Sequence, residues 1–297
     1  MRLVFKNIIY ILPFLLSSCI QDYTIDYDNS QNILTLNSEI NDSKPAEVLI
    51  ALPKKPDQFG DFYTPSDAEV NLYENGNFFE QLTFRPSTDT SFGVYISQKN
   101  LLTGNSYTIE ATYKDLPIIS ANQKIPAEPK ISNIEFGKDF SQINDVDTLP
   151  VKITFIPNDT SSKYIAVYCY LDVDLKVIDE LGDSSLQNLQ YKLEAFDDRK
   201  GFRDLKRYWV NTLPTSNEFN FNLLISSFDS IQSENIKSVQ LVILISALTE
   251  DGYLYRKTYL NRNKDNYGEP SIVYSNIKNG VGIFSAKATI RQKFKIK

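Results

Sequence analysis

The chain contains no histidine in its 297 residues, and this absence removes more candidate functions than any other feature of the sequence. Imidazole changes charge near neutral pH, serves as the base of the common hydrolase triads and is a frequent zinc ligand. Sites that depend on imidazole are therefore excluded. Catalysis by a pair of carboxylates, as in glycoside hydrolysis, is the enzymatic alternative that stays open.

Cysteine is nearly as rare, since the chain has only two. The first, Cys19, follows the three parts of a secretory signal peptide: a basic start, an apolar stretch over residues 8–16 and a small-residue exit. The apolar stretch is shorter than the roughly 20 residues that a helix needs to cross the bilayer core, so we expect no transmembrane helix. The residues just before Cys19 match the lipobox of bacterial lipoproteins: Leu16, Ser17 and Ser18.

We therefore predict that residues 1–18 are a lipoprotein signal peptide and that Cys19 becomes an acylated first residue, anchored to a membrane by its lipid. An ordinary cleaved signal peptide is the alternative. Residues 19–32 are polar and have too little apolar surface to pack, so we expect a tether. With Cys19 lipidated, Cys169 cannot form a disulfide within the chain, and we expect it to be a buried thiol in a strand.

Basic residues are in the minority, with 31 Lys and Arg against 37 Asp and Glu. Loss of residues 1–18 would remove two bases and no acid, which leaves a net charge of about −8. Such a surface repels the phosphates of nucleic acids, so we expect no nucleic acid partner. The length favours two domains, each with enough chain for its own core.

Hydrophobic residues alternate with period two along most of the chain, which predicts an all-β fold. In the first half we expect strands at regular spacing, and a tight hairpin turn at Asn75-Gly76 that is followed by a polar and aromatic return strand. Together they predict an immunoglobulin or fibronectin-like sandwich over residues 33–124. The expected strands are 32–40, 47–53, 69–73 and 107–113.

Two prolines within residues 125–130 interrupt this pattern and predict a linker between domains. Beyond it we expect a larger β-sandwich or barrel-like domain over residues 131–297, with one short helix within 226–238. The apolar run within 238–248 is typical of a central strand covered on both faces. The other strands expected in this domain are 149–157, 163–173, 217–224 and 252–260.

Two pairs of aspartates are the remaining candidates for chemistry. Asp172 and Asp174 share one face of an expected strand, and Asp145 and Asp147 do so if their segment is extended. Either pair could hold the carboxylates of a glycosidase, and the second could offer oxygens to calcium. The spacing of a calcium-binding loop is missing, so we favour solvated carboxylates and expect neither a metal nor a cofactor.

Two further features suggest binding rather than catalysis. Trp209, the only tryptophan, ends a charged stretch and could anchor a partner, although we favour a role in capping the core. The 18 tyrosines and 18 phenylalanines could stack on sugars, but strands use aromatics routinely. Gly280-Val281-Gly282 lacks the third glycine of a nucleotide-binding loop, and we expect a bend or bulge there.

Three stretches, read together, resemble the DUF4249 family of Bacteroidota lipoproteins: SDAEVNLYENG, DDRKGF and EPSIVYSNIKNGVGIFSA. The last is the most specific, and the resemblance extends over almost the whole chain. Val281 and Ser285 depart from the residues that are more frequent in the family at those positions. The family has no established activity, so the resemblance implies a location in the cell envelope but no mechanism.

The resemblance also implies a partner, because such lipoproteins are commonly encoded beside outer-membrane barrels energised by TonB. We expect a non-catalytic lipoprotein of the outer membrane that binds such a transporter or its cargo, and no enzymatic activity. A structural or adhesive surface protein is the second interpretation, and a carboxylate-based hydrolase is a remote third. Thr148, which we expect in a loop, and Ser230 lie in short patterns typical of O-glycosylation in exported Bacteroidota proteins.

The segment YSNIKNGVGIF can be interpreted in two ways. In a binding loop, the amides of Asn276 and Asn279 would face a partner. In a structural role, the apolar residues would form the closing strand of the second domain, with Asn279-Gly280 as its turn. We favour the structural role, in which these residues point inward: Ile277, Val281, Ile283 and Phe284.

Overall fold

The structure is a computed structural model, and it describes twelve stretches of the chain. These are residues 33–42, 44–53, 63–89, 91–137, 141–143, 146–156, 163–178, 184–196, 209–212, 217–224, 236–261 and 272–295. The expected signal peptide, lipobox, Cys19 and tether lie outside these ranges. Within them, no helix is both long and apolar enough to span a bilayer.

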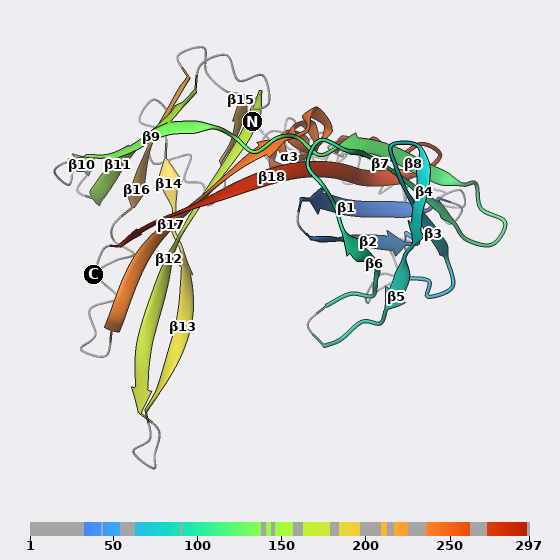
Figure 1. The fold of residues 1–297 in the computed structure, drawn as a ribbon, viewed down its shortest axis with the longest axis horizontal. Coiled ribbons are helices and arrows are strands. Elements are labelled where there is room, and N and C mark those ends of the chain that lie inside the picture. Colours follow the sequence, from blue (N-terminus) through green and yellow to red (C-terminus); the bar gives the residue numbers. More distant parts are fainter. Residues whose placement is uncertain are drawn as a thin grey trace, which may run out of the picture.

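The fold is all-β, as expected, and the described strands form three sheets without closing a barrel (Figure 1). The largest sheet has the order β13 (Ser184–Lys192), β12 (Tyr164–Ile178), β17 (Ile236–Leu248), β18 (Val281–Lys295), β1 (Thr35–Asn41), β2 (Pro45–Ala51), β6 (Val94–Asn100), β5 (Thr83–Arg85), with β15 (Trp209–Thr212) also beside β12. A second sheet has the order β10 (Ser141–Ile143), β11 (Val146–Phe155), β16 (Glu218–Leu224), β14 (Ala195–Phe196), with β9 (Ile131–Phe136) beside β11. The third has the order β4 (Asn77–Gln81), β3 (Glu69–Glu74), β7 (Ser106–Thr112), β8 (Ile119–Lys124).

The first core lies between the third sheet and the part of the largest sheet that contains β1 and β2. Period-two alternation builds it, since Tyr107, Ile109 and Ala111 of β7 are buried while the residues between them are half-buried. The hairpin between β3 and β4 turns at Asn75-Gly76, and both residues have positive φ, as a two-residue turn of this kind requires. The predictions for these strands and this turn are confirmed.

The second core lies between the second sheet and the part of the largest sheet that contains β12 and β17. β17 pairs with β12 on one side and β18 on the other, and Val242, Ile243 and Ile245 are fully buried. The apolar run was therefore read correctly as a central strand. Cys169 of β12 is a buried free thiol, as expected, and burial raises its pKa.

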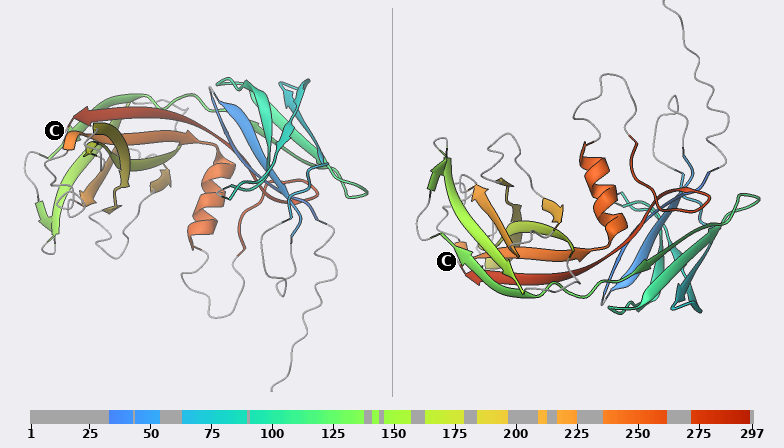
Figure 2. Two further views of the ribbon diagram at one scale, coloured as in Figure 1. Left: turned by 90° about the horizontal axis from the view of Figure 1, so that it is seen from below. Right: turned by 90° about the horizontal axis from the view of Figure 1, so that it is seen from above.

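The last strand, β18, takes part in both cores (Figure 2). Its first half pairs in parallel with β1, from Thr35 opposite Val281 to Asn41 opposite Lys287. Its second half pairs antiparallel with β17. Phe284 is fully buried in the first core, so the expectation that it closes the second domain is wrong. The division of the chain at residues 125–130 stays a prediction.

The one helix among the described residues is α3 (Glu250–Asn261), so the expected strand over 252–260 is wrong. The aromatic residues of this segment suit a strand, but its start carries a helix signal. The Thr249 hydroxyl accepts a hydrogen bond from the Gly252 N–H at 3.4 Å, and two acidic residues occupy the first turn. The short helix expected within 226–238 falls mostly outside the described residues, and residues 236–238 begin β17.

Candidate functional site

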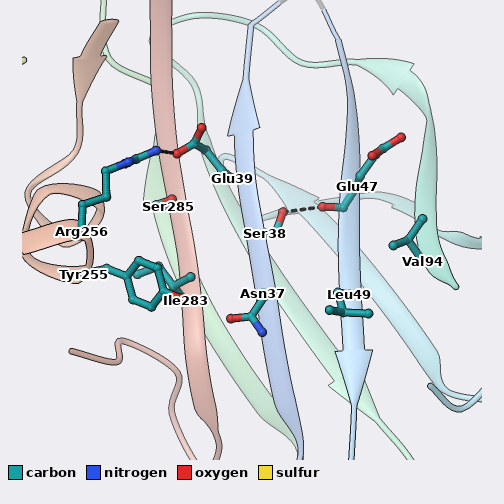
Figure 3. Close-up of a pocket in the computed structure, with 10 residues that line it drawn as sticks. All are labelled: Asn37, Ser38, Glu39, Glu47, Leu49, Val94, Tyr255, Arg256, Ile283 and Ser285. Carbon is teal, nitrogen blue, oxygen red and sulfur yellow. Dashed lines mark hydrogen bonds and ion pairs between the residues drawn. The ribbon is translucent and has the colours of Figure 1, made fainter. Parts of the chain in front are cut away.

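A groove lies beside α3 on the face of the largest sheet that turns away from the first core (Figure 3). It has a volume of about 440 Å³, within the range of small-molecule sites. Residues of β1, β2 and β18 form its floor, and Tyr255 and Arg256 of α3 form one wall. The lining residues are Asn37, Ser38, Glu39, Glu47, Leu49, Val94, Tyr255, Arg256, Ile283 and Ser285.

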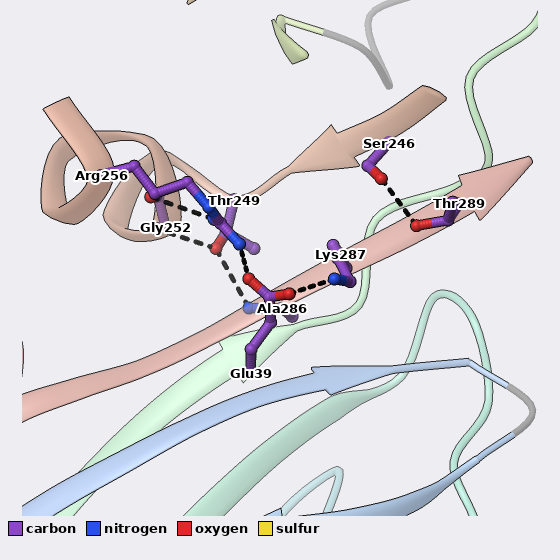
Figure 4. A network of polar contacts seen from close by, with 8 residues as sticks. All are labelled: Glu39, Ser246, Thr249, Gly252, Arg256, Ala286, Lys287 and Thr289. Atoms are coloured by element: carbon purple, nitrogen blue, oxygen red, sulfur yellow. Dashed lines mark hydrogen bonds and ion pairs between the residues drawn. The ribbon is translucent and has the colours of Figure 1, made fainter. Parts of the chain in front are cut away.

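One carboxylate and two cations define the electrostatics of this groove (Figure 4). Glu39 of β1 forms ion pairs with Arg256 of α3 and with Lys287 of β18. Burial lowers the pKa of Arg256 to about 10, and burial followed by repulsion from Arg256 lowers the pKa of Lys287. Among the described residues, this corner of the groove therefore holds one carboxylate between two basic side chains.

Two other polar residues of the groove have partners inside the protein. The Ser38 hydroxyl donates to the Glu47 carbonyl at 2.7 Å, and the Glu47 carboxylate pairs with Arg85 at 3.3 Å on the surface. Ser285 is buried. The lining combines apolar side chains with a few polar groups, as is typical of sites that bind small molecules.

A second polar cluster, at the start of α3, is centred on Asp251. Its carboxylate accepts hydrogen bonds from Tyr274, from the buried Gln123 of β8 and from Asn276, the last at 2.9 Å. The bond to Asp251, together with burial, raises the pKa of Tyr274 to about 12. The cluster thereby ties α3, β8 and the segment before β18 together.

The two asparagines that were considered for partner binding both serve the fold. The Asn276 side chain donates to the Phe284 carbonyl at 2.8 Å and accepts from the Phe284 N–H at 3.0 Å. The Asn276 side chain therefore satisfies the backbone N–H and carbonyl of the fully buried Phe284, as a neighbouring strand would. Asn279 donates to the Ile118 carbonyl at 3.0 Å and occupies the turn before β18 with φ of 57°. These contacts favour the structural interpretation of YSNIKNGVGIF.

The two glycines of Gly280-Val281-Gly282 are explained by close approach of backbones. A Cβ on Gly280 would lie 2.8 Å from the Leu34 carbonyl oxygen, and one on Gly282 would overlap that of Leu36. Gly282 also has φ of +117°, which side-chain-bearing residues rarely adopt. Val281 is 43% exposed, so its expected inward position is wrong. Ile283 is buried and lines the floor of the groove.

The first aspartate pair is engaged in the largest sheet. Asp172 pairs with Arg291 at 3.3 Å and Lys293 at 3.7 Å, and Asp174 accepts from Ser238 at 2.6 Å. Asn188 donates to both. The two hydrogen bonds lower the pKa of Asp174, so it is a poor candidate for the acid of a glycosidase, which needs a raised pKa.

Of the second pair, Asp145 lies outside the described residues, and only the backbone of Asp147 is described, in β11. Within the described ranges, no group of three or more His, Cys, Asp or Glu side chains is placed to hold a metal ion.

Three other predicted sites have different outcomes. Thr148 lies in β11 and is fully buried, so its expected position in a loop is wrong, and a sugar could reach it only after the strand opens. Ser230 lies outside the described residues. Trp209 begins β15 beside β12, and only its backbone is described.

Sequence reasoning missed the residues that build the groove and the polar cluster, above all Glu39, Arg256 and Asp251. The signal for one of them was present, because Thr249-Glu250-Asp251 is a typical helix start. A helix there would have placed Arg256 six residues into it.

The fold and these two sites define an all-β protein whose last described strand takes part in two cores and which has a groove of about 440 Å³ beside α3. The chain belongs to the family described as a domain of unknown function (DUF4249), whose family model matches residues 20–293. A search of curated proteins found none that matches.

Three of the solved structures that resemble the chain are beta-glucuronidases. One, from glycoside hydrolase family 2, is 8% identical, with 89% of this chain and 20% of that chain covered. For Bacteroides uniformis beta-glucuronidase 3 the identity is 14%, with 71% and 23% covered, and for Parabacteroides merdae beta-glucuronidase it is 13%, with 88% and 25% covered. The TM-score is 0.23 in each case, and at this value the likeness carries no argument about activity. The chain spans a quarter or less of these enzymes.

Proposed function

We propose that this protein is a non-catalytic lipoprotein of the cell envelope, anchored in the outer membrane, and an accessory or binding component of a TonB-dependent transport system. The observation that supports this location is the Leu16-Ser17-Ser18-Cys19 sequence at the end of a signal-peptide pattern. The family match, which begins at residue 20, is compatible with a mature chain that starts at Cys19.

Two observations support a role in binding rather than catalysis. The full sequence has no histidine. Among the described residues, the carboxylates of Asp172, Asp174, Glu39 and Asp251 are all held by internal partners. The groove beside α3 is the natural place for a small ligand or a side chain of a partner, because apolar and polar groups converge there.

The anchor is tested by Cys19→Ser, with Cys169→Ala as the matched control. The first variant should accumulate as an unprocessed or soluble form without acyl groups, because serine offers no thiol for lipid. The control should be acylated and membrane-bound like the wild type, since Cys169 lies buried in β12. Membrane fractionation and intact mass are the measurements. Wild-type levels of Cys19→Ser in the outer membrane, with no acyl mass in either protein, would refute the anchor.

The partner is tested by purification of the native protein after mild detergent extraction. A single stoichiometric barrel protein in the purified sample supports the accessory role. Absence of a barrel, together with loss of cell aggregation when the protein is deleted, would replace that role with a structural or adhesive one.

A further inference from the structure

The outer edge of β13 differs from the rest of the largest sheet because it is long and exposed and carries a single charge, at its last residue, Lys192. β13 ends the strand order of the sheet, and β12 is its sole strand neighbour among the described residues. Its nine residues are exposed apart from the half-buried Leu189, and Leu186 is 72% exposed. The hairpin of β12 and β13 extends away from the body of the protein (Figure 1).

The register shows which backbone groups this edge offers. The Leu193 N–H donates to the Cys169 carbonyl at 3.1 Å, which continues the register of β12 and β13. Because bonded and non-bonded pairs alternate in an antiparallel ladder, every second residue of β13 turns its N–H and carbonyl away from β12. These residues are Ser184, Leu186, Asn188, Gln190 and Lys192.

This edge lacks the devices by which proteins block strand addition. Exposed edges are normally short, or carry charges, proline or bulges. From Ser184 to Tyr191 the strand has no charged residue and no proline, and its pairing with β12 has no register shift. Exposed apolar side chains of Val177, Leu186 and Tyr191 lie on the same hairpin. The edge is therefore a template for another strand.

We propose that the occupant is a second copy of this chain, which adds its own β13 antiparallel across a two-fold axis through Asn188. This register aligns all nine residues and places the one charge, Lys192, opposite Ser184, so no like charges meet. The Asn188 side chain is bonded to Asp172 and Asp174 on the sheet face and leaves the edge clear. The projecting hairpin keeps the two bodies apart.

The contact is about 30 Å long at about 3.4 Å per residue, which is small for a protein interface. We therefore expect a weak dimer whose population rises with protein concentration. Self-association of this kind goes beyond the binding role proposed above and does not depend on a barrel partner.

The test is the oligomeric state of the full-length protein in mild detergent, measured by sedimentation over a range of concentrations. The wild type should form dimers, and Leu186→Pro should be monomeric throughout, because proline removes an outward N–H and leaves the ladder to β12 intact. Leu186→Ala keeps that N–H and should still dimerise. A monomeric wild type, or dimers of Leu186→Pro at the wild-type level, would overturn the proposal. Loss of binding to a different protein in β13 variants would not rescue it.

A second measurement guards against misfolding of the proline variant. Asn188→Cys should form a disulfide-linked dimer on mild oxidation, since residues that face each other across an antiparallel pair have Cα atoms within reach of a disulfide. Gln190→Cys lies four residues from its own copy in the proposed register and should stay monomeric. Equal cross-linking of the two variants, or none of Asn188→Cys, would overturn the proposal.

Discussion

Gly282 is the residue where an added methyl group should cost most. A Cβ there would overlap the Leu36 carbonyl, and φ of +117° is strained for any other residue. We expect Gly282→Ala to lower the free energy of unfolding by about 3 kcal/mol or more, measured by urea denaturation. Gly104→Ala is the control, because Gly104 also has positive φ but has nothing within 4 Å of its Cβ position, and it should cost about 1 kcal/mol. Equal losses would show that the close approach to β1 does not matter.

Asn276 stabilises the fold through hydrogen bonds from its side chain to the backbone of Phe284. Asn276→Ala would leave the N–H and carbonyl of the buried Phe284 without their partner, so we expect a loss of about 1–3 kcal/mol in the free energy of unfolding. Asn133→Ala removes an exposed amide that bonds only to Glu135 in the described contacts, and it should change stability by less than about 0.5 kcal/mol. A neutral Asn276→Ala, with unchanged folding, would return this residue to the list of candidate binding groups.

Tyr274 gives the protein a pH dependence at the alkaline end. Its pKa is raised from 10.0 to about 12 in the folded state, first by its bond to Asp251, so the native protein holds a proton that the unfolded chain releases. Its contribution to stability is therefore complete below pH 10 and is lost as pH rises through 12. We expect the fall in unfolding free energy between pH 10 and 12 to be shallower in Tyr274→Phe than in the wild type. Parallel pH profiles would contradict this assignment.

At the scale of the element, α3 depends on its first turn. Thr249 caps the helix through Gly252, and its hydroxyl also accepts from the Ala286 N–H of β18 at 3.3 Å. Thr249→Ala should cost about 1–2 kcal/mol of unfolding free energy, because it removes the cap and frees a buried N–H. Thr83→Ala, at an exposed position of β5, should be nearly neutral in the same denaturation experiment. A similar effect of both changes would mean that the cap contributes nothing.

Sequence patterns predicted elements well where one face is buried. Tyr107, Ile109 and Ala111 alternate with polar residues, and this alternation alone places them inside β7. The pattern gave a wrong prediction for residues 252–260. The tyrosines of that stretch favour a strand, but Thr249 caps a helix that begins just before it. The pattern also failed for Thr148, whose polarity suggested a loop although its neighbours form a continuous strand.

At the scale of the whole molecule, the groove could not be predicted, because it needs residues that are far apart in the chain. Glu39 and Arg256 meet only when β18 lies beside β1. No local signal encodes a parallel pairing between the first and last described strands. The YSNIKNGVGIF motif marked the importance of that region, yet its partner β1 could not be inferred from it.

The shared strand predicts that the two cores unfold together. Phe284→Ala in the first core should cost about 3–5 kcal/mol and should shift the melting curve seen by Trp209 fluorescence as much as the curve seen by circular dichroism. The reason is that β18 continues from Phe284 into the sheet of the second core, where β15 carries Trp209. Val281→Ala, on the exposed start of the same strand, is the control and should barely move either curve. A fluorescence transition that stays in place in Phe284→Ala would show that the cores unfold independently.

The pairing of β1 with β18 also sets the order in which the protein can mature. A ribosome makes β1 long before β18, so the flank of β1 that β18 covers stays open until β18 has been made. Contacts of such large sequence separation slow folding, and an unpaired strand flank in a nascent chain invites wrong partners. The amino-terminal half therefore cannot finish folding by itself during synthesis. The open flank of β1 must be protected by chaperones, or be exposed only briefly because synthesis is fast, until β18 has been made.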